Sequence, residues 1–302
     1  MGYKIISPAR VLIVALLWLP IVSLADSSTE PVCVHDDLMR LLCLDEPAEK
    51  IISLSPGLTE LLFAAGAGER VVGTTSYSDY PEAAKDIPRI GSHNRIDMEA
   101  VLAAEPDLVV AWISGNPTEQ LRRLEELGID VFWGEQRSFE DVAHTLERFG
   151  RLAGSEDIAH PKAAHFKTEI AALKARYADA APVRLFYQIW DDPLMTVNDE
   201  HLISRAAAVC GAKNIYGDLP RLTPRLDVES VLSKDPEAIV VAGMGEDDDS
   251  WLDPWRRFEG MTAVKRNNLY FIPPSSIQRA TPRLLEGMKR LCAHMEQARE
   301  RR

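Results

Sequence analysis

The 302-residue sequence lacks the short motifs that mark the common catalytic sites. It has no Gly-x-Ser-x-Gly elbow for a serine nucleophile, no Gly-x-x-x-x-Gly-Lys-Ser/Thr phosphate loop and no His-Glu-x-x-His zinc motif. Cys-x-x-Cys is also missing, which excludes thioredoxin-type redox chemistry and zinc-ribbon sites. Basic residues number 34 against 46 acidic ones, and the net charge of −12 argues against a nucleic-acid binder, which needs a basic face.

Long hydrophobic runs are missing too, except near the N-terminus, where residues 11–22 are apolar apart from one proline. This run is shorter than the ~20 residues that a membrane-spanning helix needs. Lys4 and Arg10 precede it, and small residues lead to an expected cleavage point at Ala25. We therefore interpret residues 1–25 as a cleaved signal peptide, with a membrane anchor as the alternative. Removing Lys4 and Arg10 from the 34 basic residues leaves 32 against 46 acidic ones, a mature net charge of −14.

Cysteine is scarce, but export would place its four copies in an oxidising compartment where disulfides persist. Cys33 and Cys43 flank a polar turn between two short apolar runs, so a hairpin would set them opposite each other within disulfide range. Cys210 stands at an expected helix end, and Cys292 lies in an expected C-terminal helix. Of the three possible pairings we favour Cys33–Cys43 with Cys210–Cys292, and four free thiols are the alternative.

Short apolar runs alternate with segments of helical spacing along most of the chain. The expected strands are residues 50–54, 71–74, 107–112, 129–133 and 183–190. The expected helices include residues 58–65, between the first two strands, and residues 119–127, between the third and the fourth. This alternation predicts βαβ units and mostly parallel sheets, which is an α/β fold. A long helical segment without glycine, residues 161–178, interrupts the pattern, and Pro161 suits its first turn.

The long helix divides the chain into two Rossmann-like α/β lobes. We predict an N-terminal lobe over residues 26–153, a linking helix over residues 154–181 and a C-terminal lobe over residues 182–302. A helical hinge resists large closure, so we expect only small movements of one lobe against the other.

An internal repeat supports the two lobes. Residues 96–110 match residues 226–240 without a gap, in the order acidic helix start, short helix, proline and apolar strand. This order is also a common local solution in α/β proteins, which is the alternative explanation. Each copy has an aspartate suited to capping the helix and a glutamate in the first turn: Asp97 with Glu99, and Asp227 with Glu229.

Aromatic residues make up only 7% of the chain, yet several stand where expected strands end. Ligands of open α/β sheets bind beyond the carboxyl ends of the strands, so Tyr77, Trp112 and Trp190 are candidate ligand contacts. Trp133 also ends a strand, and packing in a lobe core is the alternative for this group. His93, in a Gly-Ser-His-Asn loop before the first repeat, is a further candidate, with an ordinary loop residue as its alternative.

Four motifs together point to a known family. They are Ser-Pro-x-x-Thr-Glu at residues 55–60, Ser-Tyr-Ser-Asp-Tyr-Pro at 76–81, Pro-Asp-Leu-Val at 106–109 and Arg-Ala-x-Pro-Arg at 279–283. In these motifs the chain resembles the periplasmic cobalamin-binding proteins of ABC importers. They belong to the helical-backbone metal-receptor class, whose other members bind siderophores and haem. The resemblance covers nearly all of residues 50–295. His93 stands where the cobalamin binders have a tryptophan.

This resemblance implies a ligand, partners and several roles. Cobalamin or a related corrinoid would bind between the lobes as the ligand, without a resident cofactor or a catalytic residue. Tyr77 would contact it from the first lobe, and the loop of Ser275, Ser276, Ile277 and Gln278 would face it from the second. Glu99 and Glu229 would dock on arginines of a permease dimer that works with an ATPase. The resemblance also pairs Cys210 with Cys292.

We therefore expect a monomeric periplasmic substrate-binding protein that captures cobalamin and delivers it to an ABC transporter. Whether His93 approaches the metal or only lines the cleft is left open. A binder of haem or of an iron–siderophore complex is the first alternative. An exported hydrolase or other enzyme on an α/β scaffold is the second, and the missing nucleophile–base pair argues against it. A receptor that signals to a sensor protein instead of an importer is the third.

Overall fold

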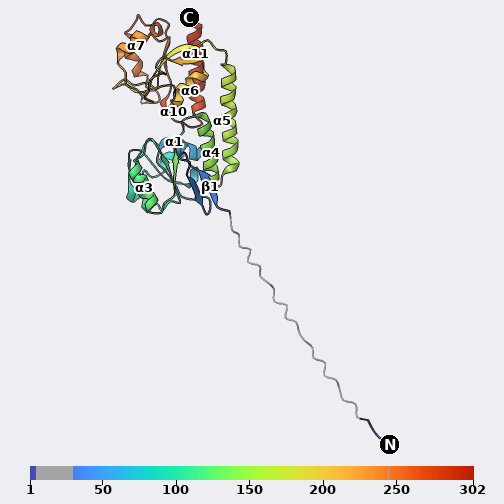
Figure 1. Cartoon of the computed structure of the whole chain (residues 1–302). Helices are drawn as coiled ribbons and strands as arrows, with labels where there is room; N and C mark the ends of the chain where they lie inside the picture. Colours follow the sequence, from blue (N-terminus) through green and yellow to red (C-terminus); the bar gives the residue numbers. More distant parts are fainter. Residues whose placement is uncertain (5–29, 244) are drawn as a thin grey trace.

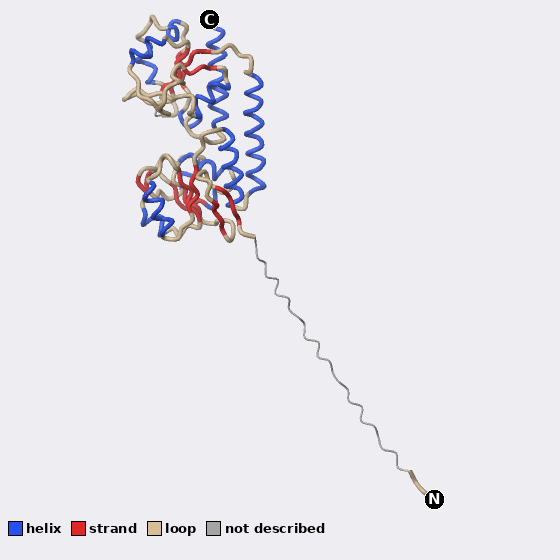
Figure 2. The backbone as a smooth tube through the Cα atoms, in the orientation of Figure 1, coloured by secondary structure: helices blue, strands red, loops and turns tan. Residues whose placement is uncertain are grey.

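A computed structural model describes residues 1–4, 30–243 and 245–302 of the chain. The predicted signal peptide therefore lies outside the described residues, apart from its first four. Within the described part, the helices are all too short or too polar to cross a membrane. Two α/β lobes follow one another, each with its strands inside and its helices outside (Figure 2).

The first lobe is built on a four-stranded parallel sheet. Its strands lie in the spatial order β4 (Val71–Thr74), β3 (Ile51–Ser53), β7 (Leu108–Trp112) and β8 (Val131–Gly134). Its helices are α1 (Pro56–Ala64), α2 (Met98–Ala103), α3 (Thr118–Glu126) and α4 (Phe139–Leu152), with 3-10 turns at Gly68–Arg70 and Glu82–Asp86 and a small ladder of β5 (Gly91–Ser92) with β6 (Arg95–Ile96). The central strand β7 is buried along almost its whole length, which explains its continuous apolar sequence.

The second lobe repeats this topology. Its parallel strands lie in the order β10 (Ala212–Asn214), β9 (Val183–Gln188), β11 (Ala238–Val241) and β12 (Leu269–Phe271). Counted along the chain within each sheet, the four strands lie side by side in the order second, first, third and fourth in both lobes. The remaining elements are α6 (Leu202–Val209), α7 (Val228–Lys234), a 3-10 turn at Ser250–Leu252, α8 (Asp253–Arg256), α9 (Thr262–Lys265), α10 (Pro274–Ile277) and α11 (Leu284–Glu300). The predicted α/β fold class is confirmed.

The internal repeat corresponds to α2 with β7 and to α7 with β11. The predicted caps form in both copies: an Asp97 carboxylate oxygen accepts from Ala100 N at 3.0 Å, and one of Asp227 accepts from Ser230 N at 2.7 Å. These bonds satisfy amide groups that a helix start would otherwise leave unpaired.

The long helix α5 (Glu156–Arg176) runs beside both lobes and packs against α4 and α11 (Figure 1). Its buried residues Phe166 and Ile170 belong to one apolar core that continues into both lobes. The helix begins at Glu156, so Pro161 lies inside it and not in its first turn as predicted. Packing of the apolar side of α5 outweighs the one backbone hydrogen bond that the proline cannot donate.

Both favoured disulfides form, so the alternative of four free thiols is wrong. Strands β1 (Val32–His35) and β2 (Leu41–Leu44) make the expected hairpin, in which Cys33 lies directly opposite Cys43 with a Cα–Cα distance of 4.1 Å. Cys210, the residue that follows α6, is bonded to Cys292 in α11.

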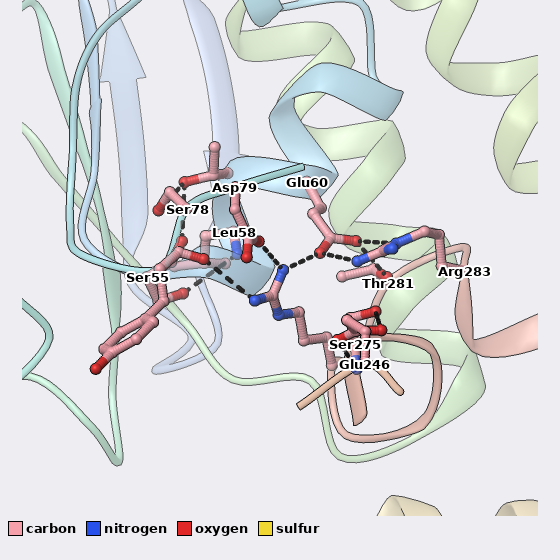
Figure 3. Close-up of polar contacts among 12 residues, drawn as sticks. Ser55, Leu58, Glu60, Ser78, Asp79, Glu246, Ser275, Thr281 and Arg283 are labelled. Atoms are coloured by element: carbon pink, nitrogen blue, oxygen red, sulfur yellow. Dashed lines mark hydrogen bonds and ion pairs between the residues drawn. The ribbon is translucent and has the colours of Figure 1, made fainter. Parts of the chain in front are cut away.

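A buried carboxylate joins the two lobes. Glu60 projects from α1 of the first lobe, and its side chain is 2% exposed. Arg279 donates to it from the second lobe at 2.7 Å, and Arg283 donates twice, at 2.7 and 3.0 Å. The hydroxyl of Thr281 adds a fourth hydrogen bond at 3.0 Å. Figure 3 shows the carboxylate pointing toward Arg283 and Thr281, and we call this set the interlobe clamp.

The clamp extends to the loop after β4. Arg279 also pairs with the Asp79 carboxylate at 2.8 Å and donates to the carbonyl oxygen of Tyr77 at 3.1 Å. Arg283 lies over the ring of Tyr80, 3.7 Å from its centroid. Burial by itself opposes the charge of Arg279, but its hydrogen bonds to Glu60 and Asp79 prevail and raise its pKa.

We expect the substitution Glu60→Gln to destabilise the protein by about 3–5 kcal/mol, because it leaves two largely buried guanidinium groups without their shared counter-charge. The measurement is the free energy of unfolding from denaturant titration. Glu169→Gln is the matched control: Glu169 pairs with Lys289 at 2.6 Å between α5 and α11, but at the surface, so its loss should change stability little. Equal effects of the two substitutions would contradict the role given to the clamp.

Candidate ligand-binding site between the lobes

A cavity of about 450 Å³ lies between the two lobes. The first lobe contributes the start of α1, the last residue of β7 and residues that follow β7 and β8: Ser55, Pro56, Gly57, Leu58, Trp112, Ser114, Glu135, Gln136 and Arg137. The second lobe contributes Ile189, Glu200, His201, Leu202, Ile203, Leu222, Thr223, Ile277, Gln278, Arg279 and Ala280. The wall combines apolar side chains with a few polar groups, which is the usual composition of a site for an organic ligand.

The sheets place these residues. Segments that follow β3, β7, β8 and β9 all reach the cavity, so it lies at the carboxyl ends of the strands of both sheets. Helix α1 also begins there, capped by Ser55, whose hydroxyl accepts from Leu58 N at 3.2 Å. The amino end of a helix carries partial positive charge, so this part of the wall favours acceptor or negatively charged ligand groups.

Trp112 is held in place from several sides. Asn116 accepts a hydrogen bond from the backbone nitrogen of Trp112 at 2.6 Å and donates to the carbonyl oxygens of Leu54 and His93 at 2.9 and 2.7 Å. The indole lies so close to Gly115 that an added Cβ would come within 1.9 Å of it. Asn116 therefore fixes the backbone at Trp112, and the missing side chain of Gly115 leaves room for the ring at the cavity wall.

Three of the eight predicted ligand residues line the cavity: Trp112, Ile277 and Gln278. Three others lie outside it with exposed side chains, each beside a residue that does line it. The backbone of Tyr77 is bonded to Arg279, the ring of His93 lies 6.2 Å from that of Trp112, and Trp190 follows Ile189.

The two predicted serines face other partners. The hydroxyl of Ser276 donates to Pro273 O at 2.8 Å, and that of Ser275 donates to Glu246 at 2.7 Å. Trp133 is 4% exposed and donates to Glu125 at 2.9 Å, so it belongs to the lobe core. Within the described part of the chain, no cluster of three or more histidine, cysteine or acidic side chains is arranged to hold a metal ion.

The sequence reasoning missed most of the polar wall. Glu135 follows β8 and accepts from the backbone nitrogen and the hydroxyl of Ser114 at 2.9 and 3.1 Å. Its position directly after a strand of the sheet was the available signal, since such positions reach the ligand edge.

His201 is the second omission. It is the N-cap of α6, where its Nδ1 accepts from Ile203 N at 3.1 Å. Burial lowers the pKa of His201 to about 4, so the imidazole is neutral at any ordinary pH. The signal in the sequence was a histidine immediately before a helical segment, a place usually taken by Ser, Thr, Asp or Asn.

Comparison with known proteins agrees with this geometry. A vitamin B12-binding protein of Vibrio parahaemolyticus is 30% identical over 273 residues, which are 90% of this chain and 98% of that protein. The crystal structure of the periplasmic vitamin B12 binding protein of Vibrio cholerae, also 30% identical, superposes with a TM-score of 0.78 and covers 84% of this chain and 99% of its own. A periplasmic heme-binding protein of Roseiflexus shares the fold at 22% identity, with a TM-score of 0.74 and coverage of 83% and 99%.

The family comparison settles the class of the protein. The model of the periplasmic binding proteins matches residues 51–276, which include both sheets and α5. These relatives are binding proteins, so the hydrolase alternative is not supported. The chain belongs to the periplasmic binding protein family.

Proposed function

We propose that this protein captures cobalamin or a related corrinoid between its lobes and delivers it to an ABC importer. Its similarity to a vitamin B12-binding protein along nearly the whole of both chains carries the proposal. The interlobe cavity supports it, because its mixed wall suits a large ligand with both apolar and amide-bearing surfaces.

We propose that part of the ligand enters the cavity and that the rest lies against the side chains at its edge. Trp112, Ile277 and Gln278 would contact the inserted part. Tyr77, His93 and Trp190 would contact the part that remains outside, since each has an exposed side chain beside the wall. Ser275 and Ser276 would act by shaping the loop that carries Gln278.

Signal-peptide cleavage, the bounds of the two lobes and the oligomeric state are also proposals. We propose cleavage near Ala25, lobes over residues 26–153 and 182–302 around a link at 154–181, and action as a monomer. The uncharged, apolar run before Ala25 supports the first point, and the position of α5 between the two sheets supports the second.

Haem or a ferric siderophore is the second candidate ligand. A heme-binding protein has the same fold, and His93 exposes an imidazole next to Trp112, where it could meet a metal centre. The two candidates differ in ligand but not in cavity or partner, so direct binding measurements separate them.

Docking on the permease is proposed for Glu99 and Glu229. Both side chains are exposed, both lie in the first turn of a short helix, and the two helices are the matched copies of the repeat. Neither carboxylate takes part in an ion pair among the described residues. Two equivalent charges, one on each lobe, suit a partner with two equivalent subunits.

We expect calorimetry on the mature protein to show binding of cyanocobalamin, and weaker or no binding of haemin and a ferric siderophore. Trp112→Leu should weaken cyanocobalamin binding up to about tenfold, because it removes an aromatic contact from the wall. The melting temperature of the variant checks that its fold is intact. Binding of haemin alone would identify the second candidate and contradict the first.

The double substitution Glu99→Ala with Glu229→Ala should reduce ligand uptake strongly in cells whose own copy of the protein has been deleted. Cyanocobalamin affinity should stay unchanged, because neither residue lines the cavity. Glu119→Ala with Glu156→Ala is the matched control, since both are exposed first-turn acids on other helices. Normal uptake by the first variant would remove Glu99 and Glu229 from docking. Normal uptake by cells lacking the protein would instead favour a receptor that signals to a sensor.

A further inference from the structure

The two ring nitrogens of His201, a residue of the cavity wall, differ in their hydrogen bonding. At the start of α6, Nδ1 of His201 accepts a hydrogen bond from the backbone nitrogen of Ile203 at 3.1 Å. A neutral imidazole has one acceptor nitrogen and one N–H, so this bond assigns the proton to Nε2. Among the described residues none accepts a hydrogen bond from that Nε2–H, although His201 lines the cavity.

The backbone around His201 is fixed before any ligand arrives. The backbone nitrogen of His201 donates to Asn198 O at 3.2 Å, and the side chain of Asn198 accepts from Glu200 N at 3.1 Å. That side chain also donates to Leu219 O at 3.0 Å, which ties the turn to the next loop. A preformed turn of this kind saves the entropy of ordering a contact residue when the ligand binds.

His201 is partly buried at a wall that carries both apolar and polar side chains. Leu202, Ile203 and Leu222 line the cavity beside it, together with Glu200 and Thr223. A donor that a bound ligand shields from water gains by finding an acceptor and loses by remaining unpaired, so it discriminates between ligands more strongly than an apolar contact does.

We propose that His201 is a specificity residue of this site, which donates an Nε2–H hydrogen bond to an acceptor oxygen of the bound ligand. Amide carbonyl, carboxylate and phosphodiester oxygens are the ligand groups that fit this chemistry. The inference rests on the proposed function, which supplies a ligand rich in such oxygens. It also argues against metal binding by His201, because the lone pair that would coordinate a metal is on Nδ1, which accepts the capping hydrogen bond from Ile203 N.

Two substitutions separate the cap from the ligand contact. His201→Asn places an amide oxygen near the position of Nδ1, and asparagine is a good N-cap, so α6 should keep its stability. The side chain is too short to replace Nε2, so the affinity for cyanocobalamin should fall about three- to tenfold. His201→Gln places an amide nitrogen near the position of Nε2. Its affinity should stay near that of the parent, while its melting temperature falls because glutamine caps poorly.

The experiment measures cyanocobalamin affinity by calorimetry and thermal stability in parallel for both variants. His165→Asn, a change at an exposed histidine of α5, is the control for loss of an imidazole elsewhere. If the parent protein binds cyanocobalamin and His201→Asn binds it equally well, the inference about His201 is wrong while the proposed function stands. If the parent protein fails to bind cyanocobalamin, both are wrong.

The absorption spectrum of aquocobalamin tests whether the His201 ring coordinates cobalt instead of donating a hydrogen bond. We expect the spectrum of the bound ligand to be the same for the parent protein and for His201→Asn. A spectral shift on binding that disappears in His201→Asn would show coordination of cobalt by this ring and would overturn the assignment of Nε2 as a donor.

Discussion

The carboxylate of Glu60 would be costly to bury by itself, and its surroundings explain why it can be buried here. Charges removed from water need close partners, and Glu60 receives them from Arg279, Arg283 and Thr281 of the opposite lobe. Since donors and acceptor come from different lobes, the pairing holds only at one distance and orientation between them. The cavity is next to this contact and shares Arg279 with it. Its width therefore depends on the clamp as well as on α5.

A fixed separation of the lobes has consequences for recognition. One apolar core continues through α5 into both lobes, and the clamp adds a second connection on the side of the cavity. The site is therefore largely formed in the absence of ligand. With little closure of the lobes on the ligand, as we propose, discrimination between ligands would depend on the individual groups of the wall, such as Trp112, Gln278 and the Nε2–H donor of His201.

The fold followed from local patterns, whereas much of the site did not. The alternation of apolar runs with helical spacing and the repeat at an offset of 130 residues predicted two related parallel sheets, because each pattern reflects burial along a single strand or helix. Cys33–Cys43 followed from hairpin geometry. Trp112, Gln278 and Ile277 line the cavity, and their contact with a ligand stays a prediction. Glu135 and His201 were missed, because their proximity comes from the way two lobes face each other, which no local pattern encodes. The sequence marks Glu60 only as part of a motif, since its partners lie more than 200 residues away.

The disulfide between Cys210 and Cys292 has a meaning beyond its local contact. Cys210 follows the last turn of α6, and His201 caps its first turn. The disulfide to α11 therefore anchors the C-terminal end of the helix whose N-terminal end forms part of the cavity wall. The eight residues of α6 thereby connect the disulfide to His201 in the cavity wall. In a reducing compartment the disulfide would not persist, and α6 would no longer be bonded to α11. The position of the cavity-lining end of α6 therefore depends on an oxidising environment, in which this disulfide persists.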